Sequence, residues 1–581
     1  MQLLKALIAL ATVLGVTNGI PDVPLDKSFR LPANFKPIHY EIRLTYDRDD
    51  PSHAHEAAVT MEVECLKSTD QVVLHANKLR IHFAELCTIH RCDEGLELVD
   101  HSDEQQTITF QSKSHLRAGE IYHMTIYYAY DVRQGGGPID GGVFSSPGSY
   151  HVVTQFQQIS ARLLFPHFDE PAYKATFQLS VAVTHPDHPD EQYPAISNAR
   201  VASMERGPSQ TVTHFDRTPY MSSYLLALAI PEYEGVTATT TGEDNPLTTV
   251  YANAALNIPP NRFISDLMRR SIQYFEQRYG IKNQLKKIDW VRDATGLAME
   301  NWGMIYGGVR PTTIVHEVAH FWTGNLMTCR FWDDIWLNEA FTSYVTFVSL
   351  DHLALGDTER AFIANTILSL ERDAAIDLQL SSDAFYGSLR AQFTHGSYIY
   401  RKGSATLRMF AEVMGGHDAF NDVLTSYIKR YAYSNVDSND LIAFLADGDS
   451  RMYEFFEDWI RQSGYPEVRY RFDASTQEFV FTQSSLATNQ TDLRWNIPIF
   501  YAIDGRLVRP PAMFPKEQEE FRLRVTDFSV FYQFNPGLIV PMNLQPAAGS
   551  GAFPMKVKAA APEDFKQLPK EEIMKGIIPE L

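Results

Sequence analysis

Positive charge is scarce in this sequence. Its 581 residues contain 51 Lys and Arg against 71 Asp and Glu, which gives a formal net charge of −20. No segment gathers Lys and Arg densely enough to form the basic patch on which nucleic-acid binders depend, so nucleic acid is excluded as a partner. The composition is otherwise that of a globular protein, and the length exceeds what one hydrophobic core fills, so we expect more than one domain.

Cysteine is also scarce. The chain has four cysteines, and no pair has the spacing of a zinc finger. Cys65 alternates with Val59, Met61 and Val63, which predicts that it points to the buried face of a strand. Cys87 and Cys92 are close enough to form a disulfide in an oxidising compartment. The alternative is that all four are reduced packing residues.

Long apolar runs are absent after the N-terminus. Ala6 to Val16 form a run of eleven residues, preceded by Lys5 and followed by small residues up to Gly19. This pattern predicts a secretory signal peptide over residues 1–19, because the run is too short to span a bilayer; the alternative is a buried helix. We therefore expect a secreted, extracellular protein with no membrane span in the mature chain. Asn489-Gln490-Thr491 is a possible glycosylation site.

Hydrophobic periodicity divides the mature chain. Residues 20–235 contain short alternating segments such as Tyr40–Tyr46 and Ala57–Cys65, which predict an all-β domain. Residues 236–465 are mostly helical in pattern; Arg262–Tyr279 places Phe263, Leu267 and Phe275 on one stripe before Gly280. Alternation returns over residues 466–545, which predicts a small β domain. Residues 546–581 are rich in Ala and Gly and then charged, which predicts a linker and a short tail.

A metal-site pattern lies in the helical part. His316 and His320 are four residues apart, so a helix carries both imidazoles on one face, a pattern suited to Zn²⁺. Glu317 lies beside the metal, where a general base for an activated water belongs. Glu339 follows His320 after eighteen residues, so a second helix can supply it as the third ligand. Cys329, between them, is expected to be a packing thiol, because a fourth protein ligand would close the site.

Several motifs then resemble those of the M1 family of gluzincin aminopeptidases, the group of aminopeptidase N and leukotriene A4 hydrolase. The metal motif is followed by WLNEAF, and Ala298-Met299-Glu300-Asn301-Trp302-Gly303 resembles the family's exopeptidase motif. Residues 154–157 (Thr-Gln-Phe-Gln) and 165–171 resemble its N-terminal signature, and Tyr400-Arg401-Lys402-Gly403 matches its Tyr-x-Lys-Gly. These motifs occur in the family's order.

The resemblance implies a role for each matching residue. His316, His320 and Glu339 would hold one zinc ion, Glu317 would activate water, and Tyr400 would donate a hydrogen bond to the oxyanion of the intermediate. Glu300 would bind the free α-ammonium of a peptide substrate, helped by Gln157. Further substrate contacts would come from the rest of these motifs, namely Gln155, Ala298, Met299 and Asn301. A Gln rather than a Glu at position 157 implies a preference for neutral or basic N-terminal residues.

The resemblance also implies a multidomain α+β fold: an N-terminal β saddle, a thermolysin-like catalytic domain and a small β-sandwich. The large helical C-terminal domain of the family is not expected in a chain of this length. Leu297 stands where the family motif has Gly, and Glu300 lies only sixteen positions before His316, fewer than in typical relatives.

Two other functions compete with an active aminopeptidase. One is a catalytically weak or inactive homologue that acts as a binding or scaffold protein. The short connection between Glu300 and His316 favours this alternative. The other is an epoxide hydrolase of the leukotriene type. That activity uses an Asp and a Tyr, whereas the corresponding positions here are Gln392 and His395.

The short connection generates a first prediction. Residues 306–311 must lead from the Glu300 segment into the metal helix, with Pro311 at the first helical position. If this holds Glu300 less accurately, turnover will be low while zinc affinity stays near normal, since a displacement of about 1 Å can cost roughly a hundredfold in rate. Steady-state kinetics and metal analysis check this. Inserting a relative's longer loop should raise turnover, and an unmodified rate of about 10 s⁻¹ or more would contradict the prediction.

Overall fold

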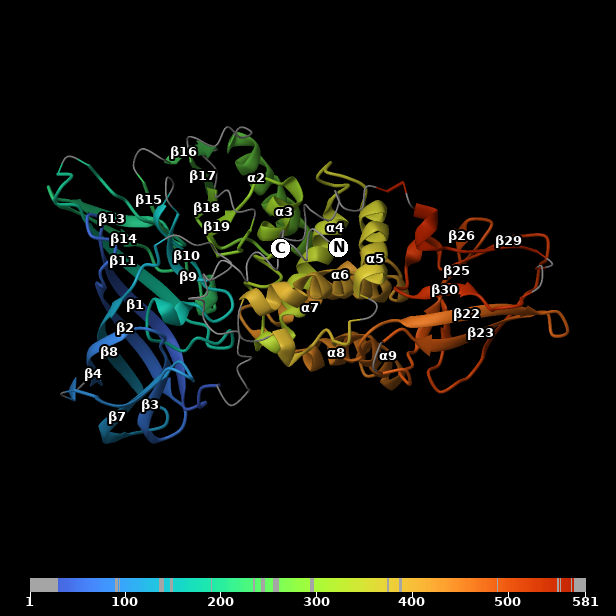
Figure 1. Ribbon diagram of the computed structural model, residues 1–581, viewed down its shortest axis with the longest axis horizontal. Helices are drawn as coiled ribbons and strands as arrows, with labels where there is room; N and C mark the ends of the chain where they lie inside the picture. Colours follow the sequence, from blue (N-terminus) through green and yellow to red (C-terminus); the bar gives the residue numbers. More distant parts are fainter. Residues whose placement is uncertain are drawn as a thin grey trace, which may run out of the picture.

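The computed structural model describes residues 30–568 except 89–91, 94, 135–140, 147–149, 190, 233–235, 242–245, 254–260, 293–296, 374–375, 386–388, 488–489, 551–552, 554 and 566. The predicted signal peptide, the glycosylation site at Asn489 and the end of the predicted tail lie outside these residues, as do the side chains of Gln392 and His395. Figure 1 shows a β-rich region, a helical region and a second β region in a row.

The N-terminal region is built on an eight-stranded sheet. Its order is β13-β14-β11-β1-β2-β8-β4-β5, in which only β1 and β11 pair in parallel. The apolar residues of β2, including Cys65, alternate onto the buried face as predicted. The strands are β1 (Phe35–Asp47), β2 (His55–Cys65), β4 (Arg80–Cys87), β5 (Cys92–Asp93), β8 (Ile121–Tyr130), β11 (Thr176–Thr184), β13 (Val201–Arg206) and β14 (Gln210–Phe215).

Two smaller sheets complete this region. One contains β3 (Thr69–His75), β7 (Thr107–Leu116) and β6 (Glu97–Ser102); the other contains β12 (Ile196–Ser197), β15 (Leu228–Pro231), β10 (Tyr150–Gln155) and β9 (Gly142–Ser146). Single 3₁₀ turns lie at Ala161–Leu163 and Ser223–Leu225. The second sheet faces the helical region and ends at Gln155, so it carries the 155–157 segment toward the predicted site.

Cys87 is disulfide-bonded, whereas Cys65 and Cys329 are free and buried. Cys87 and Cys92 are directly paired in the register of β4 and β5, and Cys92 is the remaining cysteine of the four. Of the two alternatives that the sequence left open, the structure therefore favours the bridge.

The helical region begins with a four-stranded sheet. Its order is β16 (Val236–Thr241), β17 (Leu247–Asn253), β18 (Lys287–Arg292) and β19 (Met304–Gly307), and the last three strands are parallel. Helix α2 (Asn261–Tyr279) ends at Gly280, which has a left-handed φ of 60°. Its buried face runs through Ile264, Leu267 and Phe275. Phe263, which the sequence placed on that stripe, is exposed, because each step of four residues rotates by about 40° around the helix, which carries Phe263 past the edge of the buried face.

The remaining helices pack around the predicted metal motif. Helix α3 begins at Pro311, as predicted, and contacts both α2 and α4. The elements are α3 (Pro311–Ala319), β20 (Thr328–Cys329), a 3₁₀ turn (Trp332–Asp334), α4 (Trp336–Ser349), α5 (Thr358–Asp373), a 3₁₀ turn (Asp383–Phe385), α6 (Leu389–Val413), α7 (His417–Arg430), β21 (Asn435–Val436), α8 (Ser438–Ala446) and α9 (Ser450–Arg461). No helix among the described residues is both long and apolar enough to cross a bilayer.

The C-terminal region contains two four-stranded sheets and a two-stranded one. The orders are β28-β23-β22-β30, β26-β25-β29-β31 and β24-β27. The strands are β22 (Pro466–Asp473), β23 (Glu478–Ser485), β24 (Ile497–Ile499), β25 (Tyr501–Ile503), β26 (Arg506–Leu507), β27 (Ala512–Phe514), β28 (Phe521–Arg524), β29 (Phe531–Phe534), β30 (Asn543–Pro546) and β31 (Lys556–Ala559), with 3₁₀ turns at Pro536–Leu538 and Pro562–Phe565.

The predicted boundary of this region at residue 545 is wrong. Strand β31 lies in the segment that we expected to be a linker, and it pairs in parallel with β29 from Phe531↔Lys556 to Phe534↔Ala559. The short Lys-Val-Lys-Ala segment has too few apolar residues to stand out from the alanines around it. Its strand conformation comes from pairing with a distant partner, which local pattern does not reveal.

A buried lysine ties the N-terminal region to the loop behind the metal helix. The Nζ of Lys174 donates to the carbonyl oxygens of Asn325 (3.1 Å) and Leu326 (3.0 Å). The hydroxyl of Tyr224 donates to the carbonyl of Gly324 at 3.3 Å. Burial lowers the pKa of Lys174 to about 7. These three hydrogen bonds fix the loop that follows His320.

Replacing this lysine tests the clamp. Lys174→Met keeps the length of the side chain but leaves two buried carbonyl groups without their donor, so we expect a loss of about 2–4 kcal/mol in the free energy of unfolding. Urea unfolding of the full chain measures it. Lys36→Met, at an exposed position of β1, is the control and should cost less than about 0.5 kcal/mol. Equal stability of the two variants would contradict the assigned role.

Candidate metal centre and substrate site

Two consecutive helices bring three metal-type ligands together. His316 lies on α3, His320 caps its C-terminus, and Glu339 lies in the first turn of α4. The two Nε2 atoms are 3.1 Å apart, and the Oε2 of Glu339 is 3.6 Å from that of His316 and 3.3 Å from that of His320. All three side chains are buried. The structure thus brings together the three residues that the sequence proposed as ligands.

These distances fit a tetrahedral zinc ion. Ligands about 2.0–2.2 Å from a tetrahedral centre lie about 3.3–3.5 Å from one another, close to the separations observed here. The Nδ1 of His320 lies 3.1 Å from both the carbonyl of Thr323 and the hydroxyl of Thr342. Donation from Nδ1 to that carbonyl leaves the Nε2 lone pair free for a metal. The described donor set therefore fits zinc.

The backbone around His320 has little room. Gly324 has a φ of 133°, and a Cβ at this position would lie 2.7 Å from the Nδ1 of His320. A side chain here would push the ring away from its acceptor. The glycine is therefore needed for the orientation of the metal ligand.

A second cluster shares His320. Oxygen atoms of Glu300 and Glu317 and a ring nitrogen of His320 all lie within 4.8 Å of one another, and all three residues are buried. Glu300 follows a β-bridge between Met299 and Tyr306, and its carbonyl accepts from the Nδ2 of Asn325 at 2.8 Å. The Oε1 of Glu300 has no hydrogen-bond partner among the described residues. This oxygen is available to a cationic group of a ligand.

The charges of the site are interdependent. Burial raises the pKa of Glu300 to about 7 and that of Glu317 well above its usual value. Burial lowers the pKa of His316 to about 4, so this ring is neutral at pH 7. Burial also disfavours the charged form of His320, but the charges of Glu300 and Glu339 raise its pKa to about 10. Protonated His320 thus compensates the negative charge of the neighbouring carboxyl groups. A bound divalent cation would provide the same compensation while the rings of His316 and His320 stay neutral.

Tyr400 enters the site from α6. Its ring centroid lies 5.9 Å from that of His316. Burial, reinforced by the charges of Glu339 and Glu300, raises the pKa of Tyr400 well above 10. The phenol therefore keeps its proton and remains a hydrogen-bond donor.

The substrate-binding residues predicted from the motifs are dispersed around the cluster. The Nε2 of Gln157 donates to the Oε1 of Glu339 at 3.4 Å, so its amide lies against a metal ligand rather than against Glu300. The Nε2 of Gln155 contacts the Sδ of Met299 at 3.4 Å. Asn301 is buried, and both its amide atoms lack a partner among the described residues; Ala298 is half-buried.

The sequence did not single out the residues that orient the cluster. Thr342 bonds to the ring of His320 and also donates to the carbonyl of Asn338 at 2.7 Å. It lies three positions after Glu339 and so shares its helix face. This spacing could have indicated from the sequence that Thr342 lies near the cluster. Asn325 and Lys174 gave no such signal, because they act through backbone carbonyls that only the fold brings near.

The two-histidine, one-glutamate cluster with a glutamate beside the first histidine defines a metallohydrolase site of the metalloprotease type. Comparison with known families agrees. Residues 36–225 match the Peptidase M1 N-terminal domain, and residues 308–459 match the Peptidase family M1 domain. The chain belongs to the M1 family of peptidases.

Two of the three curated relatives compared with this chain are named aminopeptidases. Leucyl aminopeptidase of Saccharolobus solfataricus is 30% identical over 441 residues, which cover 68% of this chain and 53% of its own. Aminopeptidase M1-C of Oryza sativa subsp. japonica is 28% identical over 498 residues, 81% of this chain and 54% of its own. The human thyrotropin-releasing hormone-degrading ectoenzyme is 28% identical over 526 residues, 82% of this chain and 48% of its own. The chain spans about half the length of these relatives.

Metal content tests the ligand set. His320→Ala and Glu339→Ala each remove one of three ligands, so we expect these variants to purify with well under one zinc per chain. Glu317→Gln keeps all three ligands and should retain about one zinc, while peptide turnover falls by about 10²–10⁴-fold because proton transfer is lost. Elemental analysis beside circular dichroism measures metal and folding together. Full zinc occupancy in both ligand variants would rule out the assignment.

Proposed function

We propose that this chain is a zinc-dependent aminopeptidase that removes single N-terminal residues from peptides. Bound zinc would be held by His316, His320 and Glu339 and would supply the Lewis acidity that makes water nucleophilic at neutral pH. The observation that carries the proposal is the position of Glu300 beside Glu317 and His320, where one oxygen of its buried carboxyl group has no partner among the residues that the structure describes. A carboxylate at this position can form an ion pair with the free α-ammonium group of a peptide substrate.

Glu300 would act by position and charge. A peptide α-ammonium paired with it lies next to the general base, so the first peptide bond of the chain is the one presented for attack. A blocked N-terminus would leave the Glu300 carboxylate buried without a counterion, which is costly. Selectivity for free N-termini follows from this cost.

Glu317 and Tyr400 would carry out the proton chemistry. The carboxylate of Glu317 takes a proton from the attacking water and passes it to the nitrogen of the leaving amine. The hydroxyl of Tyr400 donates to the oxygen on which negative charge develops, and a preorganised donor of this kind is worth about 10²–10³ in rate.

Residue preference and location are further parts of the proposal. Gln157 is neutral and its amide is already engaged by Glu339, so nothing in its charge attracts acidic side chains; we propose a preference for neutral or basic N-terminal residues. The disulfide of Cys87 supports action in an oxidising, extracellular compartment.

The short connection before His316 is the argument for the competing scaffold function. Despite it, Glu300 stays within 4.8 Å of Glu317 and His320, atom to atom. This proximity supports an active enzyme over a binding protein that has lost its substrate contact.

A substrate panel tests the proposed function. The zinc-loaded chain should cleave fluorogenic amides of Leu, Ala and Arg but not their N-acetylated forms. Glu300→Ala should lower kcat/KM for the free-amine substrates by at least about a hundredfold, since positioning is lost, with zinc content unchanged. Equal cleavage of free and blocked substrates would indicate an endopeptidase. No cleavage of either by the zinc-loaded chain would favour the scaffold function.

A further inference from the structure

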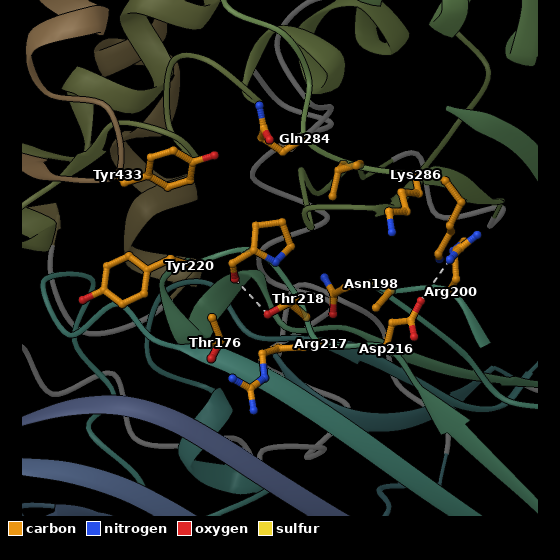
Figure 2. A pocket seen from close by; sticks show the side chains of 14 residues that line it. Thr176, Asn198, Arg200, Asp216, Arg217, Thr218, Tyr220, Gln284, Lys286 and Tyr433 are labelled. Carbon is orange, nitrogen blue, oxygen red and sulfur yellow. Dashed lines mark hydrogen bonds and ion pairs between the residues drawn. The ribbon is translucent and has the colours of Figure 1, made fainter. Parts of the chain in front are cut away.

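A large cavity lies between the N-terminal and helical regions, apart from the predicted metal site. Its volume is about 740 Å³, and its lining includes none of the metal-site residues. Five segments line it: the start of β11, residues 198–200, residues 216–220, residues 284–287 at the start of β18, and Tyr433 after α7 (Figure 2). We call this the junction cavity. Cavities of this size between domains are common sites for small molecules.

The floor of the junction cavity is fixed by hydrogen bonds. Asn198 is buried; its Nδ2 donates to the carbonyls of Leu225 (2.7 Å) and Trp302 (3.0 Å), and its Oδ1 accepts from the backbone of Ala227. The Nζ of Lys287 donates to the carbonyl of Gly303 at 3.1 Å and pairs with Asp289. A floor held in this way is preformed, so a ligand would not have to order it.

The rim carries positive charge that the described residues leave unmatched. Arg200 pairs with Asp216 at 3.3 Å, and Lys287 is balanced by Asp289. Arg217 and Lys286, both exposed, form no ion pair within the part of the chain that the structure describes. Two unmatched cations at one cavity contrast with the net charge of −20 of the whole chain. The low-dielectric walls of a cavity strengthen the attraction between such cations and an anion.

The opposite side of the junction cavity is aromatic. Figure 2 shows Tyr220 and Tyr433 together on one side, across from Lys286 and Arg200, with Arg217 between the two sides. Tyr433 is 38% exposed, and burial raises the pKa of Tyr220, so its phenol is neutral. An exposed ring and a half-buried one line the same cavity as the two unmatched cations, so the cavity offers contacts for a flat ring and for an anionic group.

We propose that the junction cavity binds a small organic anion that carries a planar ring. Arg217 and Lys286 contact the anionic group, a phosphate or a carboxylate, and Tyr220 and Tyr433 contact the ring. This site is separate from the metal centre and does not depend on the proposed peptidase activity.

Ligand-observed NMR titration of the zinc-loaded full chain tests the site, with phenyl phosphate and benzoate as ring-bearing anions. Inorganic phosphate and phenol carry the anionic group and the ring alone. We expect a dissociation constant of about 1 mM for the better of the two ring-bearing anions, as befits a fragment, and at least tenfold weaker binding of phosphate and phenol. Arg217→Ala and Lys286→Ala should each weaken binding about tenfold or more, since each removes a charged contact. Tyr433→Ala should weaken only the ring-bearing probes.

Three controls separate the junction cavity from other sites. Arg524→Ala on β28 and Lys556→Ala on β31 remove exposed cations of the same types in the C-terminal region and should leave binding unchanged. Treatment with a chelator should also leave binding unchanged. An anion held by zinc would instead be released when the metal is removed. The proposal is overturned if the Arg217→Ala, Lys286→Ala double variant binds as wild type does, if zinc removal abolishes binding, or if phenol binds as tightly as both anions.

Discussion

The burial of three carboxyl groups around one imidazole is the constraint on which the rest of the site depends. Glu300, Glu317 and Glu339 come from separate segments, and each has little access to solvent. Such a cluster is stable only with compensating positive charge at its centre. His320 occupies that centre, because its Nε2 faces Glu339 and its ring also neighbours Glu300 and Glu317. A metal ion bound there would therefore do more than supply chemistry, since it would also stabilise the packing of α3 against α4.

This constraint explains why the N-terminal β region is needed beside the helices. The loop after His320 carries Gly324, whose close approach leaves the ring one orientation, and that loop is held by donors from another region, Lys174 and Tyr224. Asn325 of the same loop holds the backbone of Glu300. One loop thus links the orientation of the His320 ring to the position of Glu300, and its anchor is a buried lysine whose pKa burial has lowered to about 7.

Much of the secondary structure, and the position of His316 and His320 on one face of a helix, could be predicted from sequence, because each rests on local spacing. The i, i+4 histidines, Pro311 at the start of α3 and the alternation of β2 are local signals that the structure bears out. The predictions that failed concern contacts between residues far apart in the chain. Strand β31 exists because β29 offers it a partner, and the amide of Gln157 lies against Glu339, a residue 182 positions further along the chain. The junction cavity could not be predicted from the sequence either, since its lining comes from five segments that are separate in the chain.

The short connection between Glu300 and His316 shows how a non-local contact can offset a local deficiency. The indole nitrogen of Trp290, on β18, donates to the carbonyls of Gly307 and Gly308, each at 3.1 Å. The segment that leads into α3 is therefore held by the sheet and not by its own length. Glu300 is held independently by the Met299–Tyr306 bridge and by Asn325. Neither anchor uses residues 309–310, which lead directly into α3, and the side chain of Arg310 at the N-cap makes no capping hydrogen bond to this helix. The short connection therefore bears most directly on the start of α3, and any effect on Glu300 is opposed by two anchors, the Met299–Tyr306 bridge and Asn325.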